Sequence, residues 1–170
     1  MKVHKPSLAD MVKTVDAHCE ANNRAKPNYD IEIKSNPKYY GKFTPQPEEY
    51  VRLVLKEVGA LGIKNRSNLQ SFDLNILHEI KKQSPFTIVS YLVDNKDSAE
   101  KNLEKINFRP EIYSPYFLLL NKEVINMFHA QGIKVIPWTV NEVGDMQRMI
   151  EMGVDGIITD YPNRIQLIQD

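Results

Sequence analysis

The sequence predicts a single α/β domain, spanning residues 1–170, in which helices cover a parallel sheet. Short runs rich in β-branched and aromatic residues alternate with amphipathic stretches, about six of each. This alternation is typical of parallel strands joined by helical crossovers. One junction also recurs, at residues 62–64, 132–134 and 153–155: a helix-ending glycine, an aliphatic residue and a polar residue. The repeated junction and the lack of a low-complexity linker favour an iterated βα architecture over two unlike domains.

Local signals place the elements in the first half of the chain. Ser7 followed by Asp10 has the form of a capping box, which starts a helix. After Pro27, polar and apolar side chains alternate with the period of a strand. In chain order we expect a helix from Ser7, a strand at residues 29–34, a polar loop at 35–45, a helix from Pro47 to Gly62, a strand at 68–72 and a helix capped by Asp73.

The second half continues the same alternation. In chain order we expect a strand at residues 86–93, a helix at 96–106, a strand at 112–116, a helix capped by Asn121, a strand at 133–140, a helix capped by Asn141 and a strand at 156–160. Periodicity alone leaves two architectures open, because an open doubly wound sheet and a closed barrel have the same element order.

Composition excludes several classes of protein. The formal net charge is zero, with Lys+Arg 22 against Asp+Glu 22, so the chain lacks the positive field of a nucleic-acid-binding protein. The single cysteine, Cys19, excludes an intramolecular disulfide and a cysteine-based zinc cage. No apolar run approaches the roughly 20 residues of a membrane span, and no signal peptide is visible. We therefore expect a soluble protein, with cytoplasmic and periplasmic or secreted locations both open.

The strand at residues 29–34 carries the first candidate site. Asp30, Glu32 and Lys34 share one face of this strand, since successive side chains point to opposite sides. Charged groups on a sheet face must be paired, metal-bound or at the open end of the strand. Glu32 is suited to a divalent cation and Lys34 to a phosphate oxygen. The alternative is a structural ion pair at the rim of the sheet.

Two further clusters lie at predicted strand ends, where parallel α/β folds place their ligand sites. Trp138 stands where a strand gives way to a helix, and it either contacts substrate or fills the rim. Asp160 follows the last predicted strand, and it either faces the same site or caps a turn. The four histidines have no metal-ligand spacing and none ends a predicted strand, so we interpret them as surface or helix-packing residues.

Taken in order, five segments resemble the glycerophosphodiester phosphodiesterases. They are residues 6–10 (PSLAD), 29–34 (YDIEIK), 69–73 (LQSFD), 138–141 (WTVN) and 153–162 (GVDGIITDYP). The resemblance implies a (β/α)8 TIM-type barrel that hydrolyses glycerophosphodiesters to an alcohol and glycerol 3-phosphate with a divalent cation, calcium or magnesium. By resemblance, Glu32 is a metal ligand, Lys34 contacts the phosphate and Trp138 lines the glycerol end of the pocket.

The resemblance covers the C-terminal two-thirds of the family pattern. The chain contains no His-Arg-Gly motif and no Glu-x-Asp pair following it, and His4 matches neither catalytic histidine of the family. We therefore expect an incomplete barrel of about six βα units that lacks the first two strands. We expect no catalytic residue among the residues present, and no cation held by this chain alone.

Three readings remain. In the first, the chain is part of a phosphodiesterase. In the second, it is a non-catalytic partial-barrel module that binds a partner chain or phosphorylated ligand. In the third, it is an unrelated βα-repeat enzyme that acts on phosphorylated metabolites. In the first two readings the open barrel edge is covered either by an N-terminal segment or by another chain in an oligomer, because exposed edges invite aggregation.

Overall fold

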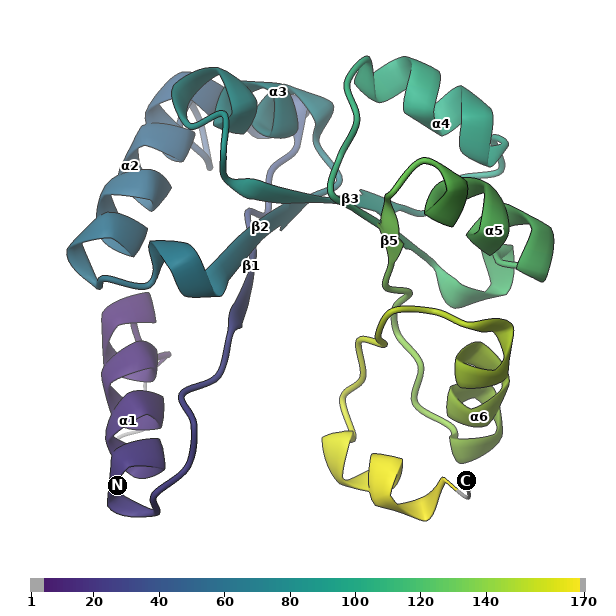
Figure 1. Ribbon diagram of the computed structural model, residues 1–170. Helices are drawn as coiled ribbons and strands as arrows, with labels where there is room; N and C mark the ends of the chain where they lie inside the picture. The colour runs from purple at the N-terminus through teal and green to yellow at the C-terminus, as the bar shows by residue number, and fades with distance from the viewer. Residues whose placement is uncertain (1–4, 169–170) are drawn as a thin grey trace.

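Five parallel strands form one sheet in which each strand pairs with the one before it in the chain (Figure 1). The computed structural model describes residues 5–168. The strands are β1 (Tyr29–Glu32), β2 (Ser67–Ser71), β3 (Ile88–Val93), β4 (Ile112–Pro115) and β5 (Lys134–Val135). The α-helices are α1 (Leu8–Ala21), α2 (Pro47–Ala60), α3 (Leu74–Gln83), α4 (Ala99–Ile106), α5 (Lys122–Ala130) and α6 (Val143–Met152). The predicted alternation of helices with parallel strands is confirmed.

Side-chain caps start several of these helices where the sequence predicts them. The side chains of Ser7, Asp73 and Asn121 accept hydrogen bonds from backbone N–H groups in the first turns of α1, α3 and α5. Helix α4 is shorter than the predicted 96–106, because Ser98 caps it and the helix begins at Ala99. No helix in the described part of the chain is long and apolar enough to cross a bilayer.

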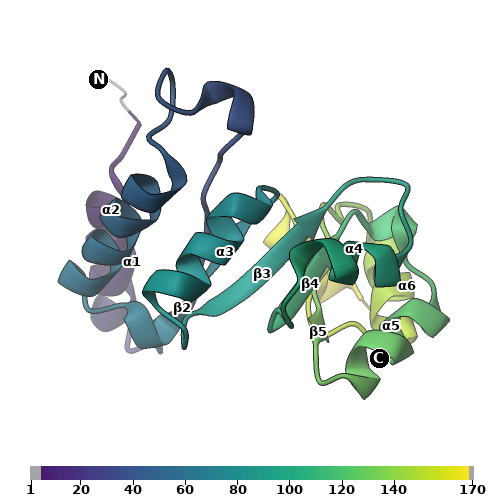
Figure 2. The same cartoon turned by 90° about the horizontal axis from the view of Figure 1, so that it is seen from above.

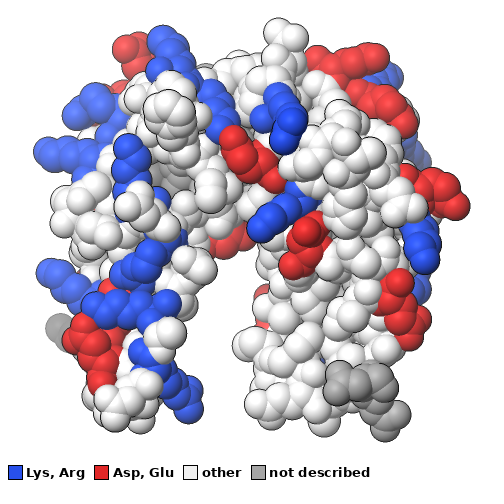
Figure 3. Space-filling view, in the orientation of Figure 1, with Lys and Arg blue, Asp and Glu red and all other residues white. Residues whose placement is uncertain are grey.

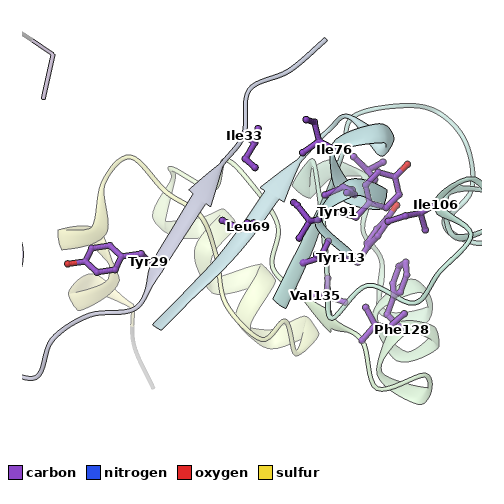
Figure 4. Close-up of a cluster of buried hydrophobic side chains, with 14 of the residues drawn as sticks. Tyr29, Ile33, Leu69, Ile76, Tyr91, Ile106, Tyr113, Phe128 and Val135 are labelled. Atoms are coloured by element: carbon purple, nitrogen blue, oxygen red, sulfur yellow. The ribbon is translucent and has the colours of Figure 1, made fainter. Parts of the chain in front are cut away.

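One face of the sheet is apolar and forms the core. Leu69 of β2 pairs with Val89 of β3, and Tyr91 of β3 pairs with Tyr113 of β4, so these side chains point to the same side. Figure 4 shows this cluster, in which Tyr113 stacks on Phe128 of α5 with ring centroids 4.0 Å apart. Burial of this face against the helices supplies the main stabilisation of the fold.

The other face of the sheet is largely polar, and we call it the open face. Neighbouring strands pair Glu32 with Gln70, Gln70 with Ser90, Ser90 with Ile112 and Ile112 with Lys134. Figures 1 and 2 show the helices around the outer side of the curved sheet. Figure 3, in the orientation of Figure 1, shows a hollow between the part of the molecule that contains α1 and the part that contains α6. The open face corresponds to the interior of a barrel.

The predicted strand at residues 133–140 is regular only over β5. Backbone hydrogen bonds continue beyond it, from Ile136 N to Tyr113 O at 3.0 Å and from Trp138 N to Pro115 O at 3.1 Å. The backbone of Pro137 faces the segment at residues 156–160, where its oxygen accepts from Ile158 N, but it has no N–H to donate, so the ladder is interrupted on that side. The prediction of a parallel strand here was right about its direction and wrong about its regular length.

The predicted sixth strand, at residues 156–160, is not a regular strand. The chain lies beside the end of β5 and makes backbone hydrogen bonds from Asp155 N to Val135 O, from Ile158 N to Pro137 O and from Val140 N to Ile158 O, at 2.8–2.9 Å. Because β5 is only two residues long, it offers too short a template for a full ladder. The described sheet therefore has five strands where about six were expected.

Candidate active site

Glu32 and Lys34 lie together at the C-terminal end of β1. Glu32 is on the open face, because it pairs in register with Gln70. The Lys34 ammonium donates a hydrogen bond to Glu32 Oε2 at 2.7 Å, which is the ion pair that the sequence left as an alternative. The Glu32 side chain is 25% exposed and that of Lys34 is 80% exposed. The carboxylate is thus sheltered, while the ammonium remains accessible to an approaching anion.

Asp30 lies on the same face, two residues before Glu32. Its Oδ1 accepts a hydrogen bond from Asn68 Nδ2 at 2.5 Å. Although the Asp30 side chain reaches solvent, the concave surroundings withdraw water from its carboxylate and raise its pKa to about 6, and the negative charge of Glu32 adds to the shift. Asp30 is therefore a carboxyl group that changes charge near neutral pH.

Gln70 is a residue of this face that the sequence reasoning missed. It is only 8% exposed, and its Oε1 finds no hydrogen-bond donor among the described residues. A buried amide oxygen without a donor is costly, and such groups occur where a ligand or another segment satisfies them. The sequence contains a signal for Gln70. Asn68 and Gln70 flank Leu69 along β2, just as Asp30 and Glu32 flank Ile31 along β1.

Trp138 forms an aromatic wall at the same end of the sheet. Its Nε1 donates to Ser114 O at 2.8 Å, which fixes the plane of the indole. Its ring contacts Phe72 edge-on, with centroids 5.4 Å apart, and Tyr116 at 5.7 Å. Phe72 follows β2 and is 45% exposed. Rings that follow β2, β4 and β5 therefore meet at one place, across the end of β3.

The pairing register relates this wall to the charged pair. Glu32 and Gln70 are the last registered pair of β1 and β2, and Lys34 and Phe72 each follow this pair by two residues, just beyond the strand ends. Phe72 in turn contacts Trp138. Glu32, Lys34 and Trp138, the three site residues predicted from the sequence, thus lie at one end of the open face.

Asn141 and Asp160 form a polar link beside this site. Asn141 was predicted to cap α6, and that prediction is wrong: Glu142 is the N-cap residue and its side chain makes no capping bond. The Asn141 amide instead donates to Asp160 Oδ2 at 2.9 Å and accepts from Asp160 N at 3.0 Å and from Thr159 Oγ1 at 3.1 Å. These bonds to Thr159 and Asp160 occupy the Asn141 side chain, so it does not cap the helix.

A comparison with protein families gives a match between residues 2–164 and the model of the glycerophosphoryl diester phosphodiesterase family. The chain belongs to this family. The order of the five segments that resemble the family, the parallel sheet and the position of the charged pair at its C-terminal end all agree with that membership.

Individual members of the family resemble the chain over about half of their own length. It is 33% identical to a glycerophosphodiester phosphodiesterase of Caldanaerobacter subterraneus subsp. tengcongensis, over 79% of this chain and 52% of that protein. It is 30% identical to a glycerophosphodiester phosphodiesterase of Bacillus subtilis, over 80% of this chain and 47% of that protein.

A solved structure supports the same relationship. The crystal structure of a putative glycerophosphoryl diester phosphodiesterase from Silicibacter pomeroyi DSS-3 matches 96% of this chain and 56% of that chain, with a TM-score of 0.79 and 30% identity. Together with the parallel sheet, this match confirms the incomplete (β/α)8 barrel that the family resemblance implied.

The described histidines lie on helices, outside the open face. His18 is in the last turn of α1, His78 of α3 bonds the backbone oxygen of Ile106, and His129 of α5 pairs with Asp155 at 2.8 Å. These positions agree with the interpretation as surface or helix-packing residues. His4 lies outside the described residues.

The described residues do not fit a complete site for the divalent cation that the family resemblance implies. Within residues 5–168, no group of three or more His, Cys, Asp and Glu side chains is placed to hold a metal ion. The Glu32 carboxylate also bonds the Lys34 ammonium. Calcium and magnesium take about six or more oxygen ligands, so Glu32 can supply only one part of such a site.

Proposed function

We propose that this chain contributes one part of the active site of a phosphodiesterase that converts glycerophosphodiesters to an alcohol and glycerol 3-phosphate. The observation that carries the proposal is the Glu32–Lys34 pair at the C-terminal end of a strand, in a chain of the glycerophosphoryl diester phosphodiesterase family. In this proposal the exposed Lys34 ammonium neutralises a phosphate oxygen, and Trp138 lines the glycerol end of the pocket. An ammonium placed where charge develops is a strong contribution to catalysis.

In this proposal, two functions of the active site come from residues beyond those described. Glu32 would be one ligand of a calcium or magnesium ion, and the remaining ligands would be supplied by another segment or chain. Proton transfer to the leaving alcohol, typically worth about 10²–10⁴-fold in rate, needs an acid–base group that no described histidine supplies at this face. We therefore propose that the 170-residue chain is inactive by itself.

The experiment is phosphodiesterase turnover of glycerophosphocholine, with and without a chelator, for this chain alone and mixed with an N-terminal segment that carries His-Arg-Gly and Glu-x-Asp. We expect no turnover from the chain alone and chelator-sensitive turnover from the mixture. In the mixture, Lys34→Ala should lower turnover by about 10²-fold, because the ammonium that neutralises a phosphate oxygen is lost. Lys56→Ala, on the exposed side of α2, is the matched control. Chelator-sensitive turnover by the chain alone would contradict the proposal.

A second candidate function is a non-catalytic module that binds a phosphorylated ligand or a partner chain. It is favoured by the pairing of Lys34 with Glu32 and by the open face, where Ile88 is 46% exposed. Trp138 is the single tryptophan of the chain, so its fluorescence reports on ligands at this site. A fluorescence change with glycerol 3-phosphate, combined with an inert mixture in the turnover assay, would select this module.

A further inference from the structure

The loop between β1 and α2 concentrates positive charge at one end of the molecule. Lys34, Lys38 and Lys42 fall between Glu32 and Glu48, and the segment between these two glutamates contains no acidic residue. Lys34 pairs with Glu32, so the positive charge available to a ligand rests mainly on Lys38 and Lys42, in a chain whose formal net charge is zero. Lys38 and Lys42 are both exposed, and we call residues 34–46 the basic loop.

The basic loop also exposes aromatic side chains between its lysines. Phe43 is 82% exposed and Tyr39 is 48% exposed, and their rings meet edge-on with centroids 5.6 Å apart. A phenylalanine this exposed leaves nearly all of its apolar surface in water. Figure 2 shows the loop, in dark blue, projecting away from α2 and α3.

The loop is nevertheless held in a defined shape. Tyr39 O accepts backbone hydrogen bonds from Lys42 N and Phe43 N, both at 3.0 Å, and Gly41 N donates to Thr44 O at 2.8 Å. Gly41 has a φ of +71°, which suits glycine in a turn this tight. The Tyr40 hydroxyl donates to Asp73 at the start of α3. One side of the loop is thus anchored to the fold, and Tyr39 and Phe43 remain exposed.

We infer that the basic loop docks on an anionic lipid surface. Aromatic rings enter the headgroup region of a bilayer favourably, and each lysine near an anionic leaflet adds electrostatic attraction. Separate side chains that protrude from a preformed loop suit a soft lipid interface better than a protein partner, which needs a larger complementary area. The inference goes beyond the proposed function and does not depend on catalysis.

Docking of this loop has a geometric consequence. The basic loop follows the C-terminal end of β1, the end at which Lys34 and Trp138 also lie. A lipid surface that holds Phe43 would therefore face the candidate site rather than the opposite end of the sheet. Phe86 marks that opposite end, because it precedes β3, and it is 97% exposed.

Vesicle co-sedimentation of the full chain tests the inference. We expect binding to mixed phosphatidylserine–phosphatidylcholine vesicles, loss of binding at high salt, and little binding to pure phosphatidylcholine. Lys42→Glu should weaken binding by at least about fivefold, since the contribution of one lysine is lost. Phe43→Ser should also weaken binding, and because both side chains are exposed neither change should affect folding, as circular dichroism would verify.

Two variants serve as matched controls. Phe86→Ser removes an even more exposed ring at the other end of the sheet, and Lys56→Glu reverses a charge on α2. Both variants should bind the mixed vesicles as the parent chain does. Equal loss of binding with Phe86→Ser, or unchanged binding with Phe43→Ser and Lys42→Glu, would overturn the inference. Binding to polyglutamate without binding to the mixed vesicles would also overturn it, in favour of an acidic protein partner.

Discussion

Asp30 shows how a concave sheet face alters the chemistry of one residue. Its carboxylate reaches solvent, but its surroundings exclude enough water to favour the neutral form and raise its pKa to about 6. The nearby negative charge of Glu32 acts in the same direction, while the hydrogen bond from Asn68 opposes it. Ionisation of Asp30 therefore works against folding.

Because ionisation of Asp30 opposes folding, we expect the stability of the chain to depend on pH. The pKa of Asp30 is higher in the folded chain than the value of about 3.9 in unfolded chains, so its contribution to the free energy of unfolding falls as pH rises from about 4 to about 6. Asp30→Asn should abolish that fall and stabilise the chain by about 1 kcal/mol at pH 8; solvent screening keeps the gain below the full value of the shift. Denaturant unfolding at about pH 4 and pH 8 measures the difference.

Asp10 provides a control of opposite sign. The hydrogen bonds from Ser7 lower the pKa of Asp10, so its ionised form stabilises the folded state above the unfolded pKa and this stabilisation is lost as pH falls. Asp10→Asn should therefore lower stability at about pH 8 and have little effect in acid. The same direction of change for both variants would show that the surroundings of Asp30 do not disfavour its charge.

The residues of the candidate site differ in how visible they are in the sequence. Glu32 and Lys34 stand out because charges alternate with isoleucines along one strand, a pattern that has few structural explanations. Gln70 carries no charge, so its alternation with Asn68 is a weaker signal, and its burial and unpaired Oε1 are what make it stand out. Their functional roles stay predictions.

At the scale of elements, strongly apolar and well-capped segments were predictable and irregular ones were not. The strand predicted at residues 86–93 is β3, starting at Ile88, because β-branched and aromatic residues suit a buried parallel strand. The segments at 133–140 and 156–160 have a similar composition, but Pro137 and the shortness of β5 limit their ladders. The effect of Pro137 was readable from the sequence, whereas the length of β5 depends on its neighbours, which local composition does not encode.

Asn121 and Asn141 were both predicted to cap helices, but only Asn121 does so, and substitutions at the two positions test this difference. Asn121 uses only an acceptor oxygen, toward Val124 N at 2.9 Å, whereas Asn141 also donates, to Asp160. Asn121→Ala should cost about 1 kcal/mol, and Asn121→Asp should be nearly neutral, because aspartate caps equally well. Asn141→Asp should be clearly destabilising, since it loses a donor and faces the Asp160 carboxylate. Melting temperatures by circular dichroism compare the three; a neutral Asn141→Asp would contradict the assigned link.

At the scale of the whole molecule, the sheet has an uncovered edge and an open face. Within the described residues, β1 has a hydrogen-bonded neighbour on one side only. The open face includes the half-exposed Ile88, and Phe86 extends from the start of β3. Exposed edges and apolar patches favour association.

We therefore expect the 170-residue chain to self-associate or to be only marginally stable. Phe86→Lys should shift sedimentation toward the monomer, because it places charge on the exposed apolar surface, whereas Phe43→Ser at the other end should leave sedimentation unchanged. Sedimentation velocity across a range of concentrations measures both. A monodisperse monomer with a sharp, high-temperature unfolding transition would show that the open edge neither promotes association nor destabilises the chain.

The chain-ordered sheet also bears on how the protein is made. Every described strand after β1 pairs with the strand synthesised just before it, so each new βα unit meets its template as soon as it leaves the ribosome. Contacts between near neighbours in sequence form quickly, because little loop entropy is lost in closing them. Growth of the sheet can thus keep pace with translation, and an inner strand spends little time exposed before the next one covers it.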